Sequence, residues 1–226
     1  MKRLFEYSDE ALGVLIRFLL MIGIKLICRP KIYFTSPEVQ KYMIETPSVI
    51  ISNHLLLMDG ALIGTAFYGQ KVHFMIAKDL LSTEPRRWIA SKCRCIPLKR
   101  YVSDTSWLKK GAEAIKKGSS ICIFPEGDTS RKGETKPFKP GFVLLALHSG
   151  APILPVCLEG PYKIFGKRQR ILIDKPIQLV IPAEGITSDF VRSATRLINE
   201  RVLYLQELLR EKTNFVECEH KRRAVL

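Results

Sequence analysis

Ser48-Val49-Ile50-Ile51-Ser52-Asn53-His54 is the segment that decides the fold. Its β-branched residues predict a short buried strand, and polar residues follow directly at the carboxyl end of that strand. Similar apolar runs recur along the chain, and segments with helical spacing lie between them. The strands are expected at 72–76, 95–98, 120–124 and 153–158, and the helices at 60–68, 104–117 and 141–149. This alternation predicts an α/β fold with a mixed, largely parallel sheet flanked by helices.

The length and the absence of repeats or Gly/Ser-rich linkers predict a single globular domain. We divide the 226 residues into a membrane-associating helical segment (1–30), the main domain (31–217) and a charged tail (218–226). A last helix is expected to open at Ser188-Asp189, because such residues favour helix starts and apolar residues follow at helical spacing.

The charge of the chain is strongly positive, with 36 Lys and Arg against 22 Asp and Glu, a net +14. Such an excess favours a polyanionic partner. No zinc-finger spacing, RNP-like run or helix-turn-helix pattern occurs, so an anionic membrane surface or a phosphate-bearing substrate fits better than nucleic acid. The six cysteines complete no metal-binding pattern and are expected to be reduced thiols, as in a cytoplasmic protein.

Residues 11–28, ALGVLIRFLLMIGIKLIC, form the longest apolar stretch. Arg17 and Lys25 interrupt it, and on a helix both would fall on one side, with Leu15, Phe18, Leu19, Ile22 and Leu26 opposite. This pattern is typical of a helix in the headgroup region, with its cations near anionic lipid. A membrane span and an ordinary core helix are the alternatives. We expect a peripheral or monotopic protein on the cytoplasmic face of the cell membrane.

His54 and Asp59 are five residues apart, immediately after the predicted strand. They meet most easily if His54 lies in the turn before a helix and Asp59 lies in its first turn. A carboxylate bound to Nδ1–H would set the tautomer and leave Nε2 as a base. Such spacing also occurs by chance in helices with no catalytic role, so it needs a second motif beside it.

Phe124-Pro125-Glu126-Gly127 follows another predicted strand. Parallel strands would bring it to the same edge of the sheet as His54. Cations and glycines occur downstream in 130–133 and 137–141, a composition that suits a phosphate. On turn chemistry alone, the segment is equally consistent with a structural turn and a surface glutamate.

Taken together and in this order, the two motifs resemble the glycerolipid acyltransferase family typified by 1-acylglycerol-3-phosphate acyltransferase. Arg94 to Arg100 and Ala151 to Val156 are similar to two further blocks of that family. The resemblance implies an enzyme of phospholipid biosynthesis that moves a fatty acyl group from acyl-CoA or acyl carrier protein to the hydroxyl of a lysophospholipid, first of all 1-acylglycerol 3-phosphate, without a cofactor or metal. It implies catalytic roles for His54 and Asp59, and substrate-binding roles for Asn53, Arg100, Glu126, Gly127 and Arg131.

The chain departs from the family pattern at two places. Arg94 and Lys99 stand where the second block usually has Gly and Asp, and Thr129 stands where an arginine usually follows the Glu-Gly pair. Arg131 is expected to replace that arginine, or else the acceptor is a different one, such as glycerol 3-phosphate or an amino-acid lysolipid. The remaining alternative is a non-catalytic protein that binds anionic lipid. No G-x-S-x-G, P-loop or G-x-G-x-x-G motif supports another enzyme class.

Overall fold

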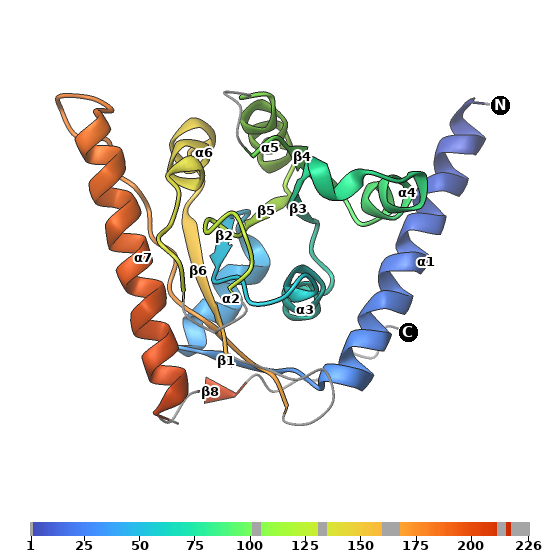
Figure 1. Ribbon diagram of the computed structural model, residues 1–226, viewed down its shortest axis with the longest axis horizontal. Helices are drawn as coiled ribbons and strands as arrows, with labels where there is room; N and C mark the ends of the chain where they lie inside the picture. The colour runs from blue at the N-terminus through green and yellow to red at the C-terminus, as the bar shows by residue number, and fades with distance from the viewer. Residues whose placement is uncertain (1, 101–104, 131–134, 160–167, 212–215, 218–226) are drawn as a thin grey trace.

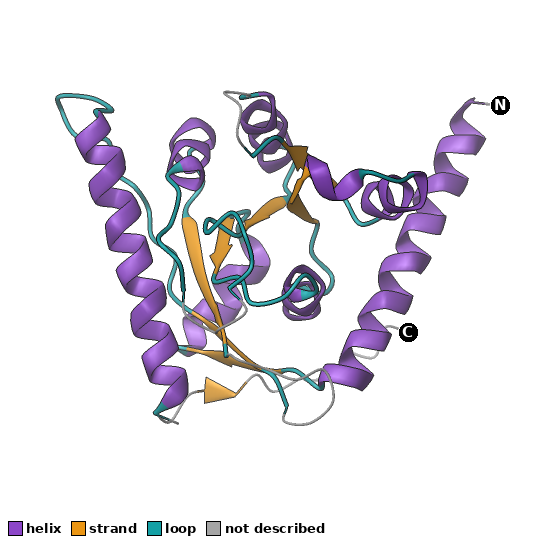
Figure 2. Ribbon diagram, viewed as in Figure 1, coloured by secondary structure: helices purple, strands orange, loops and turns teal. Residues whose placement is uncertain are grey.

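The protein is a three-layer α/β structure, with helices on both faces of one sheet (Figures 1 and 2). The computed structural model describes residues 2–100, 105–130, 135–159, 168–211 and 216–217. Within these residues, eight strands form a single sheet in the order β4-β3-β5-β2-β6-β7-β1-β8. The predicted fold class, a mixed and largely parallel sheet flanked by helices, is confirmed.

The parallel part of the sheet consists of neighbouring strands that share one direction. It is made of β4 (Cys95–Leu98), β3 (Val72–Ala77), β5 (Ser120–Ile123), β2 (Val49–Ser52) and β6 (Ile153–Leu158). The reversed part begins where β7 (Arg170–Ile173) pairs antiparallel with β6, and it continues into β1 (Lys31–Phe34), which is parallel to β7. The edge strand β8 (Val216–Glu217) pairs antiparallel with β1.

β2 lies at the centre of the sheet and carries side chains into two separate cores. Ile50 packs with residues of α1 (Lys2–Cys28), α2 (Pro37–Glu45) and α3 (Asp59–Ala66) on one face. Val49 and Ile51 pack on the other face with residues of α5 (Ser106–Lys116), α6 (Gly141–Ser149) and α7 (Ser188–Arg210). All four residues of β2 are buried, as expected for a strand covered on both faces. The 3₁₀ turn η1 (Lys78–Leu81) and the helix α4 (Glu84–Lys92) connect β3 to β4.

α1 packs with one side only, against α3 and α4 (Figure 1). Ile24 and Cys28 are buried in the core, whereas the apolar residues predicted to form one face of the helix are all exposed: Leu15, Phe18, Leu19, Ile22 and Leu26. Asp9–Cys28 is long and apolar enough to cross a membrane, which is weak evidence for membrane association. The charged tail, 218–226, lies outside the described residues.

Arg17 and Lys25, the two cations that interrupt the apolar stretch of α1, both contact the rest of the domain. Arg17 donates a hydrogen bond from Nη1 to the Lys92 backbone oxygen at 2.5 Å, and Lys25 Nζ lies 5.5 Å from the centroid of the Tyr68 ring. Both side chains therefore contact the domain while the apolar side of the helix is exposed. That these two cations lie near anionic headgroups stays a prediction. An amphipathic pattern identifies two faces of a helix and does not say which of them packs on the rest of the protein.

Candidate active site

Two loops meet at the carboxyl ends of β2 and β5, which are adjacent and parallel. The first loop carries Asn53 and His54, and the second carries Phe124 to Gly127. The carboxyl ends of parallel strands are where open α/β sheets bind their ligands. Although 72 positions separate His54 from Glu126, the sheet places them in direct contact.

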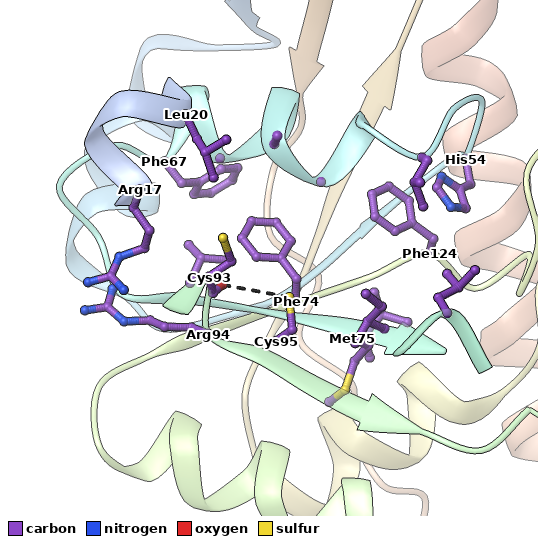
Figure 3. A pocket seen from close by; sticks show the side chains of 18 of the residues that line it. Arg17, Leu20, His54, Phe67, Phe74, Met75, Cys93, Arg94, Cys95 and Phe124 are labelled. Carbon is purple, nitrogen blue, oxygen red and sulfur yellow. Dashed lines mark hydrogen bonds between the residues drawn. The ribbon is translucent and has the colours of Figure 1, made fainter. Parts of the chain in front are cut away.

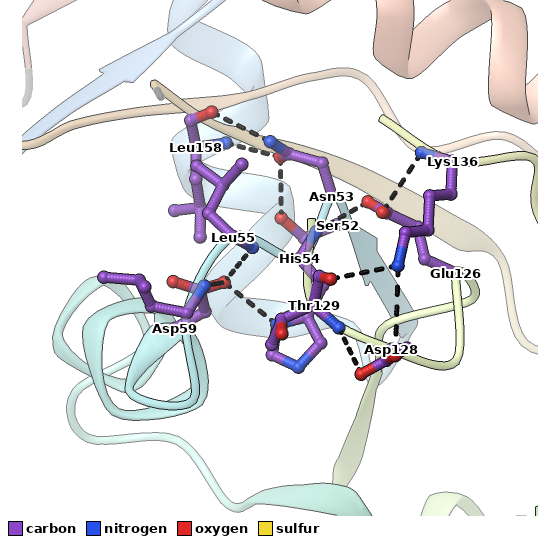
Figure 4. Close-up of polar contacts among 11 residues, drawn as sticks. Ser52, Asn53, His54, Leu55, Asp59, Glu126, Asp128, Thr129, Lys136 and Leu158 are labelled. Carbon is purple, nitrogen blue, oxygen red and sulfur yellow. Dashed lines mark hydrogen bonds and ion pairs between the residues drawn. The ribbon is translucent and has the colours of Figure 1, made fainter. Parts of the chain in front are cut away.

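His54 and Asp59 form a hydrogen-bonded pair, with Nδ1 of the ring 2.9 Å from Oδ2 of the carboxylate (Figure 4). His54 lies in the loop before α3, and Asp59 is the first residue of that helix. A carboxylate at this position accepts the Nδ1 proton and leaves the lone pair on Nε2. Within the described residues, Nε2 has no hydrogen-bond partner, so the ring is oriented as a general base would be.

Asp59 also organises the backbone of the loop. The same Oδ2 accepts hydrogen bonds from the backbone amides of Leu55 at 2.5 Å and Leu56 at 2.8 Å. The side chain is completely buried. A buried carboxylate is stable only when hydrogen bonds compensate its lost hydration, and the two amides and the imidazole provide them here. Asp59 therefore both orients His54 and closes the turn that carries it.

Glu126 lies behind His54 rather than in open contact with a ligand. Its Oε1 accepts a hydrogen bond from the His54 backbone amide at 2.7 Å, and its Oε2 accepts one from the Lys136 backbone amide at 3.1 Å. Burial raises the pKa of Glu126 above its usual range, and these two amides oppose that shift. Glu126 therefore joins the two loops by accepting from a buried backbone amide of each, and its predicted substrate contact stays a prediction.

Asn53 likewise binds backbone groups, and its predicted substrate contact stays a prediction. Its Nδ2 donates to the Leu158 backbone oxygen at 3.0 Å, and its Oδ1 accepts from the Leu158 amide at 2.8 Å. The side chain has no exposed surface. Asn53 thus extends the pairing between β2 and β6 past the end of β2, and so fixes where His54 leaves the sheet (Figure 4).

The His54 ring borders a large cavity of about 1020 Å³ between the sheet, α1 and α3. One face of the ring stacks on Phe124, with centroids 4.2 Å apart and planes at 20°. The cavity walls near the middle are apolar and include Phe67, Phe74 and Met75 (Figure 3). A site of this size and character suits a ligand with a long apolar portion whose reacting end lies at His54.

Arg100 and Gly127 line the same cavity beside His54. Arg100 pairs with Asp79 through Nε and Nη2, and its Nη1 donates to the Gly127 backbone oxygen at 3.2 Å. Gly127 has φ +75°, and a Cβ there would lie 2.7 Å from Nζ of Lys139. The left-handed backbone is what favours glycine here, since the end of the lysine side chain could move aside.

Asp128 lines the cavity next to Gly127, and two lysines lie just outside this lining, Lys136 near Asp128 and Lys139 near Gly127; we call these two the lysines of the rim. Lys136 donates from Nζ to the Thr129 backbone oxygen at 3.0 Å, and it lies 3.9 Å from Asp128. Thr129, which stands in place of the usual arginine, lines the cavity. Arg131 lies outside the described residues, so its predicted phosphate contact stays a prediction. Among the residues described, no group of His, Cys, Asp and Glu has the arrangement of a metal site.

Comparison with known proteins identifies a family that the chain matches. The model of the family described as Acyltransferase matches residues 31–159, which include both loops. The chain is 33% identical over 144 residues to the chloroplastic 1-acyl-sn-glycerol-3-phosphate acyltransferase BAT2 of Brassica napus, a match that covers 59% of this chain and 41% of that protein. It is 27% identical over 168 residues to the 1-acyl-sn-glycerol-3-phosphate acyltransferase of Bacillus subtilis, covering 71% of this chain and 82% of that one.

The fold is similar to that of a solved structure as well. The crystal structure of the 1-acyl-sn-glycerophosphate acyltransferase PlsC from Thermotoga maritima superposes with a TM-score of 0.61 at 20% identity, covering 90% of this chain and 82% of that chain. The chain spans about two fifths of the length of the chloroplast relatives that it matches.

Proposed function

Because the chain belongs to the acyltransferase family, we propose that it moves a fatty acyl group from a thioester donor, acyl-CoA or acyl carrier protein, to the free hydroxyl of 1-acylglycerol 3-phosphate. The observation that carries the proposal is the 2.9 Å contact between His54 Nδ1 and Asp59 Oδ2 at the edge of an apolar cavity. A histidine held in this way is suited to remove a proton from an alcohol, and the cavity is suited to an acyl chain.

In the proposed reaction, Nε2 of His54 takes the proton of the acceptor hydroxyl as its oxygen attacks the thioester carbonyl. The carbonyl carbon becomes tetrahedral, the carbon–sulfur bond then breaks, and the imidazolium returns the proton to the departing thiolate. Asp59 stabilises the imidazolium between the two steps. The products are an ester and a free thiol, and His54 ends in its starting state.

The acceptor phosphate is proposed to bind where Gly127 brings the backbone close to the cavity beside Arg100. A guanidinium offers two parallel donors to a phosphate. Arg100 pairs with Asp79 through Nε and Nη2 and holds the Gly127 loop through Nη1, so a phosphate here would compete with the exposed Asp79 for these donors. Arg131 would add a second guanidinium to this region, as the resemblance implies. The cations of the rim, Lys136 and Lys139, support a site for a doubly charged headgroup.

An acyl-transfer assay with purified full-length protein tests the function. Lysophosphatidate, glycerol 3-phosphate and an amino-acid lysolipid are offered as acceptors, each with acyl-CoA and with acyl carrier protein. We expect transfer to lysophosphatidate, and none by the His54→Ala protein. If only another acceptor receives the acyl group, the proposed chemistry stands and that acceptor replaces lysophosphatidate as the proposed substrate. Binding of anionic lipid without transfer from either donor would overturn the proposed function.

A further inference from the structure

The end of the cavity away from His54 is lined by two arginines from different elements. Arg17 projects from α1, and Arg94 lies in the turn between α4 and β4. Figure 3 shows their guanidinium groups next to each other, on the opposite side of the cavity from His54 and Phe124. Neither residue has a part in the acyl transfer described above.

The backbone of Arg94 has an unfavourable conformation for an arginine. Its φ is +57°, in the left-handed region that glycine adopts freely and that a residue with a long side chain rarely adopts. The Arg94 backbone is nevertheless built into the fold, since its oxygen accepts a hydrogen bond from the Phe74 amide at 3.2 Å. Arg94 directly follows the C-cap of α4, where a left-handed residue is common and is usually glycine, so an arginine stands here in place of the residue that fits best.

The charges of the two arginines are poorly compensated. In the described part of the chain, the Arg94 guanidinium has no hydrogen-bond or ion-pair partner. Arg17 donates to the Lys92 backbone oxygen, Glu10 is the acidic residue close enough to act on its charge, and the nearby Asp9 is paired with Lys92. Burial and the neighbouring Arg94 both lower the pKa of Arg17. Two like charges at the end of an apolar cavity would be stabilised by an anion between them.

We propose that Arg17 and Arg94 together bind the phosphate of an anionic glycerolipid. Two guanidinium groups side by side match the oxygens of a phosphate, and each offers several donors. Apolar side chains adjoin the pair within the cavity, including Leu20 and Phe67, and these favour a lipid over a free ion. The helix that carries Arg17 exposes its apolar side, so a membrane lipid is the nearest source of such a phosphate. The site is distinct from the acceptor site beside Gly127.

A binding measurement without any acyl donor tests this proposal, so that its outcome does not depend on the proposed reaction. The full-length protein is titrated calorimetrically with a water-soluble, short-chain phosphatidylglycerol, which is neither substrate nor product of the proposed reaction, and, separately, with inorganic phosphate. The variants are Arg94→Gly, Arg17→Gln and the double variant. Arg86→Gln is the matched control, because Arg86 is an exposed arginine of the neighbouring α4 that does not line the cavity.

We expect Arg94→Gly and Arg17→Gln each to weaken binding of the short-chain lipid by about tenfold or more, the usual effect of removing a charged hydrogen bond. The double variant should lose little beyond the larger single effect, because the two residues form one site. Glycine suits the backbone at 94, so Arg94→Gly should not lower the unfolding midpoint. Binding to phosphatidylcholine vesicles that contain phosphatidylglycerol should weaken in parallel.

Three results would overturn the proposal. The first is an equal effect of Arg86→Gln, which would mean that only the general charge matters. The second is full additivity in the double variant, which would mean two independent surface cations. The third is inorganic phosphate binding as tightly as the short-chain lipid, which would make this a site for a free anion instead of a lipid.

Discussion

The backbone amide of His54 donates a 2.7 Å hydrogen bond to Oε1 of Glu126, so the acid of one sequence motif positions the base of the other. The second oxygen of Glu126 accepts from the Lys136 amide, which ties the downstream loop to the same point. This arrangement gives a physical reason why the two motifs occur together. The backbone amides of His54, Leu55 and Leu56 in this loop need hydrogen-bond acceptors. Glu126 provides one for His54, and Asp59 provides one for the other two.

His54→Ala should abolish most acyl transfer and leave the fold intact. The ring stacks on Phe124 at the edge of the cavity and is not part of the buried core. Loss of a general base costs about 10²–10⁴ in rate. The measurement is kcat with lysophosphatidate, alongside circular dichroism. His148→Ala, at an exposed histidine of α6, is the control. A folded His54→Ala protein with wild-type turnover would show that His54 is not the base.

Asp59→Asn should lower kcat by roughly 10⁴, as when a histidine base loses its orienting carboxylate and takes the wrong tautomer. It should also destabilise the protein, because the buried carboxylate accepts from two backbone amides that an amide group satisfies less well. Steady-state kinetics and urea unfolding measure the two effects. Asp189→Asn, at an exposed aspartate in the first turn of α7, should leave kcat unchanged and lower stability by at most about 1 kcal/mol, the usual effect of a charge at a helix start. If stability falls while kcat does not, Asp59 only shapes the loop and does not orient a catalytic base.

Glu126→Gln should destabilise the protein by about 1–3 kcal/mol, because one of the two amides that Glu126 satisfies would lose its acceptor.

The difference in stability between the wild type and Glu126→Gln should also depend on pH. Burial raises the pKa of Glu126, so the folded state binds its proton more tightly than the unfolded state does. The stability of the wild type relative to the glutamine variant is therefore greatest below about pH 4.3, the ordinary pKa of a glutamate, and declines as the pH rises through the raised value.

Urea unfolding of both proteins over a pH series measures that difference. Glu211→Gln, at an exposed position, is the matched control and should give a flat difference. An increase in the relative stability of the wild type as the pH rises above the ordinary glutamate value would contradict the assigned direction of the shift.

The sequence predicted the central strands well because their side chains alone identify them. β2, β5 and β6 are unbroken apolar runs covered on both faces, and the structure places them where expected. β1 and β7 were not predicted, since each has four residues, begins with a cation and owes its order to a parallel partner more than a hundred residues away. The starts of α2 and α4 did carry a signal, a serine or threonine shortly before a proline, which favours helix initiation.

The site was predictable to the extent that it follows from strand ends. Adjacent parallel strands necessarily bring His54 near Glu126, and local spacing brings His54 near Asp59. The partners of Asn53 and Glu126 were not predictable, because Leu158 and Lys136 reach them only through the tertiary fold. Polar residues beside a catalytic histidine suggest substrate contacts when only the sequence is known. The structure shows that both are buried and hold the loops, and their predicted substrate contacts stay predictions.

The exposed face of α1 should control membrane binding. Leu15→Gln, Leu19→Gln and Leu26→Gln should each weaken binding to vesicles by about tenfold or more, since full burial of a leucine contributes about 1.5–3 kcal/mol. High salt should leave this apolar contribution in place. Substitution is a sharper test than deletion of residues 1–28, because Ile24 and Cys28 belong to the core and Arg17 lines the cavity. Cosedimentation with vesicles is the measurement.

The control for the α1 substitutions is Leu197→Gln, at an exposed leucine of α7. If this variant loses vesicle binding and the α1 variants keep it, the anchor lies on the last helix.

Arg131→Lys should raise the KM for a phosphate-bearing acceptor by roughly tenfold to a hundredfold, because the charge is kept while the two-pronged hydrogen bond, worth about 1.5–3 kcal/mol, is lost. The KM for the donor should stay the same. The reason lies at Thr129, which occupies the place of the usual arginine and lines the cavity, so that a guanidinium for the phosphate has to come from elsewhere. Arg131 is two residues further along the same loop.

Kinetics at saturating donor, with one acceptor that bears a phosphate and one that lacks it, measure this effect of Arg131→Lys. Arg168→Lys, at an exposed position, supplies the control for exchanging the two cations. Arg100→Lys provides a useful contrast. Arg100 holds the Gly127 loop as well as facing the cavity, so its replacement should lower kcat as well as raise the acceptor KM. Equal effects of Arg131→Lys on both acceptors, or none on either, would mean that Arg131 does not bind the phosphate, and Arg100 with the lysines of the rim would then have to bind it alone.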